Sequence, residues 1–298
     1  MLVLDNPAGV APAALRDIVL TLQCPDTTGI VAAVTGFLAD RNALITQTQH
    51  FDDPYSITSF LRVVFRIDGV EPSLGELDRQ FAAAVGDRFA MKWQFHDARR
   101  RCRVVLAVSK HAHCLNSFLH RWSTGTLPVE VLAVVSNHED LRRLAEWHGV
   151  PYYHFPTDAG RKAEQEQRII ELFERMDAEL LVLARYMQIL SEDACRYFAG
   201  RAINIHHSFL PGFKGARAYH QAFERGVKLI GATAHYVTGH LDEGPIIDQE
   251  VERVDHTLSP DDLADVGRDL ESVTLNRAVK WHAERRVFQN QGKTVVLR

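Results

Sequence analysis

Two polar side chains on a short extended segment are suited to chemistry at a carbonyl carbon. In residues 202–206, Ile203 and Ile205 alternate with Asn204 and His206. Successive side chains of an extended segment point to opposite faces, so Asn204 and His206 share a polar face. An asparagine amide can donate a hydrogen bond to a developing oxyanion, and a histidine can exchange a proton near neutral pH. If the pair stood alone, a surface asparagine and a hydrogen-bonded core histidine would be the plainer interpretation.

A second polar segment further along the chain accompanies this pair. It contains His235 and Thr238, followed by Asp242 in a turn rich in glycine and proline. A carboxylate held beside an apolar strand can order a water molecule. A turn-capping role is the alternative for Asp242. Because Glu243 is the next residue, its side chain points elsewhere, and we expect no catalytic pair of carboxylates.

The elements that must hold these side chains alternate between strands and helices. Apolar runs predict strands at residues 104–108, 129–135 and 180–184, and helical spacing predicts helices at residues 115–122, 139–148, 164–176 and 260–286. This alternation is typical of βαβ units that build a parallel, doubly wound α/β sheet with helices on both faces. The chain has neither a GxGxxG motif nor a P-loop motif, so dinucleotide or P-loop phosphate binding is not indicated. The last helix is expected to pack through Leu263, Val266, Leu270, Val273 and Val279.

The N-terminal part of the chain has a different order of elements. Strand patterns occupy residues 17–24, 44–51, 57–67 and 91–95, and helical patterns occupy residues 30–38 and 72–85, the second opening at Pro72. The resulting βαββαβ order is typical of a ferredoxin-like unit. In the third strand, Ile57 is expected to share the apolar face of Leu61.

This unit resembles an ACT domain, a small module that binds amino acids. The resemblance rests on Cys24-Pro25-Asp26-x-x-Gly29-Ile30 at the first junction between strand and helix. Such a junction offers the free N–H groups of a helix N-terminus to a carboxylate. Asp26, Gly29 and Ile30 are therefore the predicted effector site. The alternatives are a tight turn without a ligand and a module that only mediates assembly.

A charged run, Asp97-Ala98-Arg99-Arg100-Arg101, marks the predicted domain boundary. We expect an ACT-like regulatory or assembly domain over residues 1–97 and a catalytic domain over residues 98–298. Three successive arginines can bind nucleic acid, but a solvated linker is the better interpretation.

Composition argues against several classes of function. Lys and Arg number 34 and Asp and Glu number 38, which gives a net charge of −4 and no general attraction to nucleic acid or anionic membranes. The four cysteines form no CxxC motif, which favours free thiols in the cytoplasm. We expect no signal peptide in residues 1–15 and no membrane helix. His111-Ala112-His113-Cys114 suggests metal ligands, but no further spaced Cys/His cluster supports a metal site.

Four segments together resemble the folate-dependent formyltransferase family. They are Asn204-x-His206-x-Ser208-x-Leu210-Pro211-x-Phe213-x-Gly215, His235-x-Val237-Thr238, Leu241-Asp242-x-Gly244-Pro245-Ile246-Ile247 and Leu183–Leu190, in family order within residues 102–285. The resemblance implies a Rossmann-like fold and 10-formyltetrahydrofolate as the formyl donor, with no cofactor. It implies that Asn204, His206 and Asp242 are catalytic and that His235 and Thr238 support them. It also implies a folate pocket lined by Arg185, Tyr186, Met187, Gln188, Ile189 and Leu190.

Three features bear on the acceptor of the formyl group. Residues 108–116 contain no glycine, whereas family members that accept a ribonucleotide hold its phosphate with a glycine-rich loop, although Lys110 could still bind an anion. We expect no C-terminal β-barrel of the kind that helps to bind RNA. The ACT-like unit and the doublet His206-His207 resemble the hydrolytic branch of the family, in which water accepts the formyl group.

The predicted function is hydrolysis of 10-formyltetrahydrofolate to formate and tetrahydrofolate in one-carbon metabolism and purine biosynthesis. Asp242 and His206 order the water, and Asn204 and His206 stabilise the oxyanion. His207, the third supporting residue, is expected to face away from Asn204 and to shape the acceptor side. The resemblance makes glycine or methionine the first candidate effectors. A homo-oligomer is the expected assembly, because a βαββαβ unit covers one face of its sheet and leaves its edges and other face to be covered. The alternatives are a formyltransferase with a small amine acceptor and a non-catalytic amino-acid sensor.

Overall fold

The computed structural model describes residues 16–67, 72–157, 160–212 and 218–298. The chain divides into two compact units. One comprises residues up to Arg100 together with Leu297–Arg298, and the other comprises Arg101–Val296. Among the described helices, none combines the length and the apolar composition that crossing a membrane requires.

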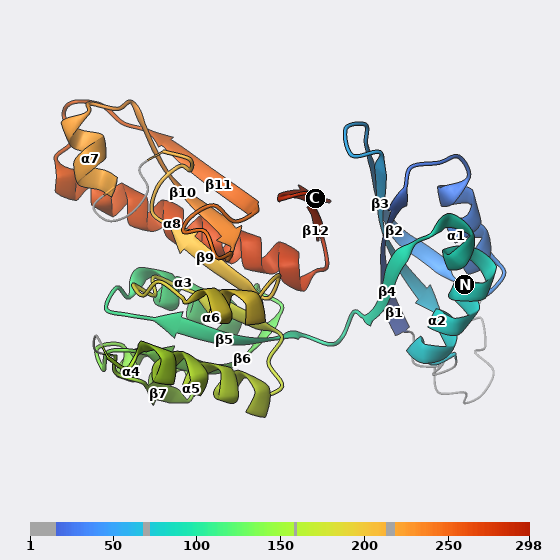
Figure 1. The fold of residues 1–298 in the computed structure, drawn as a ribbon, viewed down its shortest axis with the longest axis horizontal. Helices are drawn as coiled ribbons and strands as arrows, with labels where there is room; N and C mark the ends of the chain where they lie inside the picture. The colour runs from blue at the N-terminus through green and yellow to red at the C-terminus, as the bar shows by residue number, and fades with distance from the viewer. Residues whose placement is uncertain (1–15, 68–71, 158–159, 213–217) are drawn as a thin grey trace, which may run out of the picture. The chain divides into compact units, whose positions relative to one another are not determined.

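The N-terminal unit is an antiparallel sheet with helices on one face (Figure 1). Its strands are β1 (Arg16–Pro25), β2 (Leu44–Asp53), β3 (Thr58–Ile67) and β4 (Lys92–Asp97), in the order β2-β3-β1-β4. Its helices are α1 (Ile30–Ala39) and α2 (Leu74–Phe81), and α2 continues into the turns η1 (Ala82–Gly86) and η2 (Asp87–Phe89). The predicted βαββαβ order is confirmed and is compatible with an ACT-like domain.

Alternating residues of the central strands form the core of this unit. Leu20 and Leu22 of β1 and Leu61 and Val63 of β3 belong to one buried cluster beneath the helices. The expectation for Ile57 is wrong, because this residue precedes β3, has a φ of 50° and is 65% exposed. Its left-handed backbone interrupts the alternation that the sequence pattern extends back from β3.

The second unit is built on a seven-stranded sheet in the order β11-β10-β9-β8-β5-β6-β7. Its strands are β5 (Cys102–Val108), β6 (Val129–Ser136), β7 (Tyr152–His154), β8 (Leu180–Leu183), β9 (Ala202–His206), β10 (Leu229–Tyr236) and β11 (Ile246–Arg253), and a hairpin of β12 (Val287–Asn290) and β13 (Lys293–Val296) follows. The strands from β9 to β7 are parallel, whereas β10 is antiparallel to both β9 and β11. The predicted doubly wound sheet is confirmed, and it carries an antiparallel edge.

Helices cover both faces of this sheet (Figure 1). One face packs against α3 (His113–Ser123), α4 (Arg142–Trp147) and α8 (Pro260–Ala283), and the other against α5 (Lys162–Arg175) and α6 (Glu192–Tyr197), while α7 (Ala218–Glu224) packs against α8. The central strand shows why both faces are covered. Val104 and Leu106 point into one core cluster, and Val105 and Ala107 point into the other.

Some helix boundaries and faces differ from the predicted ones. Helix α2 begins at Leu74 rather than at Pro72, because Ser73 caps it by accepting a hydrogen bond from the Glu76 backbone. Helix α4 is shorter than the predicted 139–148. In α8, Val273 is 41% exposed rather than part of the inner stripe.

The buried face of α8 includes a charged residue. Leu263, Gly267, Glu271, Leu275 and Val279 are buried at every fourth position along the helix. Residues at this spacing lie on one face of a helix. A carboxylate therefore occupies a position that the spacing assigns to the core.

Candidate active site

The pairing of β9 with β10 gathers polar side chains on one face of the sheet. The register places Asn204 opposite His235 and His206 opposite Thr233. Residues directly opposite each other in an antiparallel pair point to the same face. Asn204 Nδ2 lies 3.2 Å from His235 Nε2. The polar face expected for Asn204 and His206 thus gains two residues from the neighbouring strand.

A backbone contact fixes the position of the proton on His235. The ring Nδ1 lies 2.9 Å from the carbonyl oxygen of Tyr236, which can only accept, so Nδ1 carries the hydrogen. Nε2 is then an acceptor and receives the hydrogen bond that Asn204 Nδ2 donates. Burial lowers the pKa of His235, so the ring is neutral at pH 7. His235 therefore orients the amide of Asn204, whose Nδ2 carries a second hydrogen.

Asp242 stands between the two histidines. Its Oδ1 lies 3.2 Å from His206 Nδ1 and 4.0 Å from His235 Nε2. The side chains of His206 and Asp242 are 5% and 6% exposed, so water and salt screen their interaction weakly. The carboxylate can therefore stabilise a protonated His206.

A close backbone approach holds the loop that carries Asp242. Asp242 itself has a φ of 57°, in the left-handed region. A Cβ atom on Gly244 would lie 1.7 Å from the carbonyl oxygen of Tyr236, so only glycine fits there. The backbone N–H of Tyr236 also donates to the Pro245 carbonyl at 2.9 Å. The Tyr236 carbonyl therefore has two roles: it accepts the hydrogen of His235 Nδ1, and the loop that carries Asp242 packs against it.

Two residues that the sequence analysis missed hold the segment that follows His206. Thr233 Oγ1 donates to the Ser208 carbonyl at 2.8 Å and accepts from the Leu210 N–H at 3.0 Å. Gln249 Nε2 lies 3.0 Å from both Thr233 Oγ1 and the Leu210 carbonyl oxygen. The alternation along β10 could have indicated Thr233. No local pattern points to Gln249, because its role depends on the pairing of β10 with β11.

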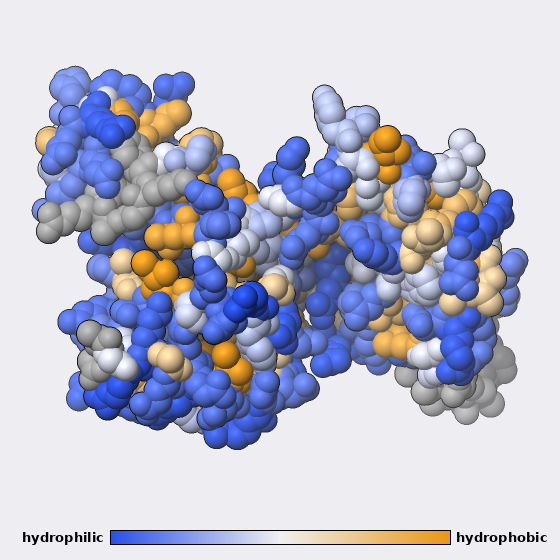
Figure 2. Space-filling model, viewed as in Figure 1, coloured by the Kyte–Doolittle hydropathy of each residue, from blue (hydrophilic) through white to orange (hydrophobic). Residues whose placement is uncertain are grey.

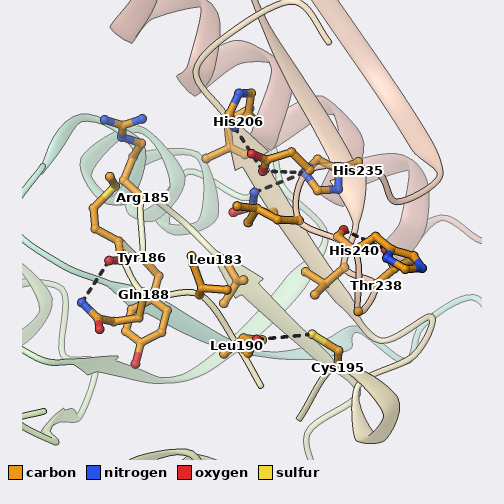
Figure 3. A pocket seen from close by; sticks show the side chains of 18 of the residues that line it. Leu183, Arg185, Tyr186, Gln188, Leu190, Cys195, His206, His235, Thr238 and His240 are labelled. Atoms are coloured by element: carbon orange, nitrogen blue, oxygen red, sulfur yellow. Dashed lines mark hydrogen bonds and ion pairs between the residues drawn. The ribbon is translucent and has the colours of Figure 1, made fainter. Parts of the chain in front are cut away.

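A cavity of about 280 Å³ opens beside these side chains. Asn204, His206, Asp242 and His235 line it. The six predicted folate-binding residues line it as well, namely Arg185, Tyr186, Met187, Gln188, Ile189 and Leu190. In Figure 3, Arg185, Tyr186 and Gln188 lie on one side of the cavity and His206 and His235 on the other. The structure therefore brings the predicted catalytic and folate-binding residues together.

Apolar side chains are exposed around this cavity. Met187, Ile189 and Leu241 are 48%, 61% and 51% exposed, and Figure 2 shows apolar atoms gathered on this face of the second unit, near β9 and α6. Thr238 also lines the cavity, and its hydroxyl donates to the His240 carbonyl at 3.1 Å. An apolar lining with a few polar groups suits a flat organic ligand that carries a reactive polar group.

His207 lies differently from the predicted arrangement. It lines the same cavity as Asn204 and His206, and it also borders a second, apolar cavity of about 320 Å³. The ring of His207 lies 4.9 Å from that of His206, which shares a face with Asn204. The expectation that it faces away from Asn204 is therefore wrong, because β9 ends at His206 and the alternation ends with it. Burial, followed by the positive charge of Arg185, lowers the pKa of His207 to about 4. This ring is therefore neutral at pH 7.

Next to His207 lies a buried group that we call the Glu271 cluster, formed by Glu271, His113, Tyr219 and Arg185. The carboxylate of Glu271 is 1% exposed and lies 2.8 Å from His113 Nε2 and 2.7 Å from the Tyr219 hydroxyl. Burial by itself raises the pKa of Glu271, but the hydrogen bond from His113 and the charge of Arg185 outweigh it and hold this pKa below its usual value.

Part of this cluster has the composition of a metal site. Ligand atoms of His113, Cys114 and Glu271 lie within 4.8 Å of one another. Arg185 Nε, however, lies 3.3 Å from the same carboxylate, and its charge opposes a cation there. Burial also raises the pKa of Cys114 well above its usual value, which disfavours the thiolate that a metal requires. These donors fit an ion-pair cluster better than a metal.

The predicted effector residues lie in the N-terminal unit, at the junction of β1 and α1. Asp26 and Gly29 are exposed there and Ile30 is buried. Gly29 has a φ of 92°, and no side chain caps the first turn of α1. Of the remaining motif positions, Phe213 and Gly215 lie outside the described residues.

The chain is similar in sequence and in fold to proteins of known family. A family model described as formyl transferase matches residues 102–279. A formyltetrahydrofolate deformylase of Corynebacterium sp. (strain P-1) is 50% identical over 280 residues, which cover 94% of this chain and 98% of the relative. The structure of a formyltetrahydrofolate deformylase from Burkholderia mallei ATCC 23344 has a TM-score of 0.89 and 51% identity, with 95% of this chain and 100% of that chain covered. A glycinamide ribonucleotide transformylase from Symbiobacterium toebii has a TM-score of 0.64 and 29% identity, with 68% of this chain and 97% of that chain covered.

Proposed function

This chain belongs to the formyl transferase family and, within it, to the formyltetrahydrofolate deformylases, and on that premise we propose that it hydrolyses 10-formyltetrahydrofolate to formate and tetrahydrofolate. The observation that carries the proposal is the grouping of Asn204, His206 and Asp242 at one cavity. The reaction belongs to one-carbon metabolism and, through it, to purine biosynthesis.

Asn204 and His206 are the groups that stabilise the oxyanion. One hydrogen of the Asn204 amide is held by His235, and the second can donate to the formyl oxygen as negative charge develops. His206, when protonated, is the second donor, and Asp242 offsets its charge at 3.2 Å. Donors that are held in place before the reaction require little reorganisation during it, which is the main source of their catalytic effect.

Water is the nucleophile. The pair His206–Asp242 accepts a proton from the water and later donates a proton to N10. Water attacks the formyl carbon and transfers a proton to the pair. The bond between the formyl carbon and N10 then breaks, and N10 takes a proton from the pair. The formic acid that forms carries one oxygen atom from water and leaves as formate once its proton has passed to solvent. His206 Nδ1 and Asp242 Oδ1 are 3.2 Å apart, so a proton can pass between the two groups. The proposed chemistry uses side chains and water and calls for no cofactor.

Residues 185–190 and Leu241 are the groups that would hold the folate. Exposed Met187, Ile189 and Leu241 offer apolar surface to the ring system, and the backbone N–H of Met187 is already engaged by Ser109 Oγ at 3.0 Å, which fixes this segment. A ring seated there would present its N10 substituent towards Asn204 and His206 across the cavity.

The experiment that tests this function uses the purified full-length chain with 10-formyltetrahydrofolate and no amine. We expect formate and tetrahydrofolate in equal amounts. A chain that releases tetrahydrofolate only after an amine is added would be a transferase, and this outcome would overturn the proposal. Binding of glycine or methionine without any turnover would instead support the amino-acid sensor.

We propose further that the N-terminal unit assembles the chain into a homo-oligomer. Strand β2 lies at the edge of its sheet, with Leu44 61% and Phe51 43% exposed. An open edge with exposed apolar side chains is commonly covered by another chain. Sedimentation of the full-length protein tests this point, and a monomer at micromolar concentration would contradict it.

Glycine or methionine is the effector that we propose for the same unit. The first turn of α1 has no side-chain cap, and its N–H groups can receive an amino-acid carboxylate beside Asp26 and Gly29. Steady-state rates with and without millimolar glycine or methionine test the regulation, and identical rates would contradict it. We also propose a cytoplasmic location, because all four cysteines are free thiols, as is usual in a reducing compartment.

A further inference from the structure

The winding of the large sheet reverses between β5 and β8. From β5 the chain passes through α3 to β6 on one side, and from β8 it passes through α6 to β9 on the other. The loop after β5 and the loop after β8 therefore run in opposite directions, and a crevice lies between them at the ends of these two strands. In doubly wound sheets, ligands bind in the crevice that such loops open. The crevice is the natural place for a second substrate in this fold.

In this chain, the crevice is occupied by the Glu271 cluster. His113 begins α3, just after β5, and Arg185 follows β8. Glu271 reaches them from α8, where it lies 2.8 Å from His113 Nε2 and 3.3 Å from Arg185 Nε. Tyr219 of α7 completes the group at 2.7 Å. All three neighbours donate hydrogen bonds or positive charge, so the carboxylate is satisfied from within the chain.

Arg185 reaches the crevice from a strained backbone. Its φ of 65° lies in the region that glycine adopts freely and other residues adopt at a cost. Its side chain is only 10% exposed, and its Nε is buried and paired with Glu271 by charge rather than by a hydrogen bond. In Figure 3 the side chain extends away from Tyr186 and Gln188.

The Glu271 cluster lies next to the catalytic residues, and His207 is in contact with both. The rings of His206 and His207 are 4.9 Å apart, and those of His207 and Tyr219 are 5.9 Å apart. Arg185 lines the catalytic cavity itself and is one of the charges that keep His207 neutral. His207 is therefore the link between the reacting side and the filled crevice.

We propose that the Glu271 cluster fills the acceptor side of the site, so that Arg185 and Glu271 determine specificity by excluding an amine and leaving water as the acceptor. The inference rests on the proposed function, because it concerns which nucleophile attacks the formyl group. A buried carboxylate beside a formyl-transfer site is a natural binding group for a primary amine. Here Arg185 neutralises it, and His113 and Tyr219 occupy its remaining hydrogen-bonding positions.

Replacing Arg185 with glycine tests this proposal. The Arg185→Gly change relieves the backbone strain, opens space and leaves Glu271 available to a cation. The matched control is Arg285→Gly, because Arg285 also has a positive φ, of 57°, but does not line the cavity. Each protein is given 10-formyltetrahydrofolate with millimolar glycinamide, and formate and N-formylglycinamide are both measured. The bound ammonium first gives one proton to Glu271, and the free amine then attacks the formyl carbon. The bond to N10 breaks as the bond to the glycinamide nitrogen forms, and the second proton of that nitrogen passes to N10.

We expect N-formylglycinamide to make up less than about 1% of the formyl product from the unmodified chain and from Arg285→Gly, and at least about 10% of it from Arg185→Gly, a rise of about tenfold or more. Arg185→Lys should keep formate as the product whatever its rate, because the positive charge remains beside Glu271. An unchanged product ratio in a folded Arg185→Gly protein, or equal transfer by the lysine variant, would overturn the proposal.

Two further measurements cover the cases in which Arg185→Gly is inactive or does not fold. If Arg185→Gly is inactive, glycinamide should still raise its melting temperature and not that of the unmodified chain, and no such rise would overturn the proposal. If Arg185→Gly does not fold, Arg185→Asn serves in its place, because asparagine tolerates the left-handed region. Formate release by the unmodified chain without glycinamide is measured alongside, so that failure of the proposed function is seen separately.

Discussion

The two sides of His206 are built in opposite ways. On one side, Asn204 and Asp242 line a cavity of about 280 Å³ that apolar side chains surround. On the other side, the carboxylate of Glu271 is 1% exposed and is satisfied by donors from the chain itself. The open side is suited to receive a folate. On the other side, which we call the filled side, the donors of the chain already satisfy Glu271, although His207 and Tyr219 also border an apolar cavity of about 320 Å³ there. Under our proposal, formyl chemistry and the choice of acceptor reside in different groups of residues.

The largest expected effect concerns the open side alone. Asn204→Ala, His206→Ala and Asp242→Ala should each lower kcat by about 10²-fold or more and leave the fold intact, because each removes an oxyanion donor or a proton-transfer group. Steady-state kinetics and circular dichroism measure the two properties. Near-normal turnover in any one of these variants would remove that residue from the mechanism.

The next effect concerns His207, at the boundary of the two sides. Burial lowers its pKa to about 4 in the folded chain, below the ordinary value of about 6.5 in the unfolded chain. The unfolded chain therefore binds the proton first as pH falls, so the contribution of His207 to stability is complete above pH 6.5 and is lost towards pH 4. We expect this contribution to be on the order of 3 kcal/mol.

Unfolding measured against pH tests this expectation. His207→Gln should flatten the loss of stability between about pH 6.5 and pH 4 relative to the unmodified chain. The same slope in both proteins would show that His207 does not titrate as described. Hydrolysis should fall less in His207→Ala than in His206→Ala, and an equal loss would give the two histidines a shared role.

A smaller effect concerns the loop that carries Asp242. Gly244→Ala should lower kcat about tenfold or more, because the added Cβ would lie 1.7 Å from the Tyr236 carbonyl oxygen and must displace the loop. Gly36→Ala is the matched control, since a Cβ at Gly36 meets no atom within 4 Å. Equal activity in the two variants would show that the loop position does not matter.

The smallest effect concerns Thr238. Its hydroxyl donates to the His240 carbonyl at 3.1 Å in an exposed part of the loop. Such a hydrogen bond contributes about 1 kcal/mol, so Thr238→Ala should lower kcat/KM by less than about tenfold. A loss as large as that of Asp242→Ala would place Thr238 in the reacting group rather than in the loop.

The open side could be predicted from the sequence because its signals are local. Two-residue alternation in residues 202–206 places Asn204 and His206 on one face, and glycine and proline mark the turn around Asp242. The βαββαβ order and the parallel strands β5, β6 and β8 were also predictable, because each carries its own apolar period.

The filled side could not be predicted, because its contacts join distant parts of the chain. The helical spacing of α8 places Glu271 on the buried face, but its partners His113 and Tyr219 come from α3 and α7 and leave no local signal. The orientation of His207 was mispredicted because strand alternation stops at His206. The short helices α6 and α7 and the three-residue strand β7 were missed, since so few residues carry little periodic signal.

The most direct test of the central claim is to follow one turnover of the full-length chain in water enriched in ¹⁸O, with 10-formyltetrahydrofolate and no amine. Attack by water on the formyl carbon requires one labelled oxygen atom in each formate molecule, with formate and tetrahydrofolate formed in equal amounts. The same experiment with Asp242→Ala should give the label at a rate lower by about 10²-fold or more. Unlabelled formate, or no formate until an amine is supplied, would contradict the account.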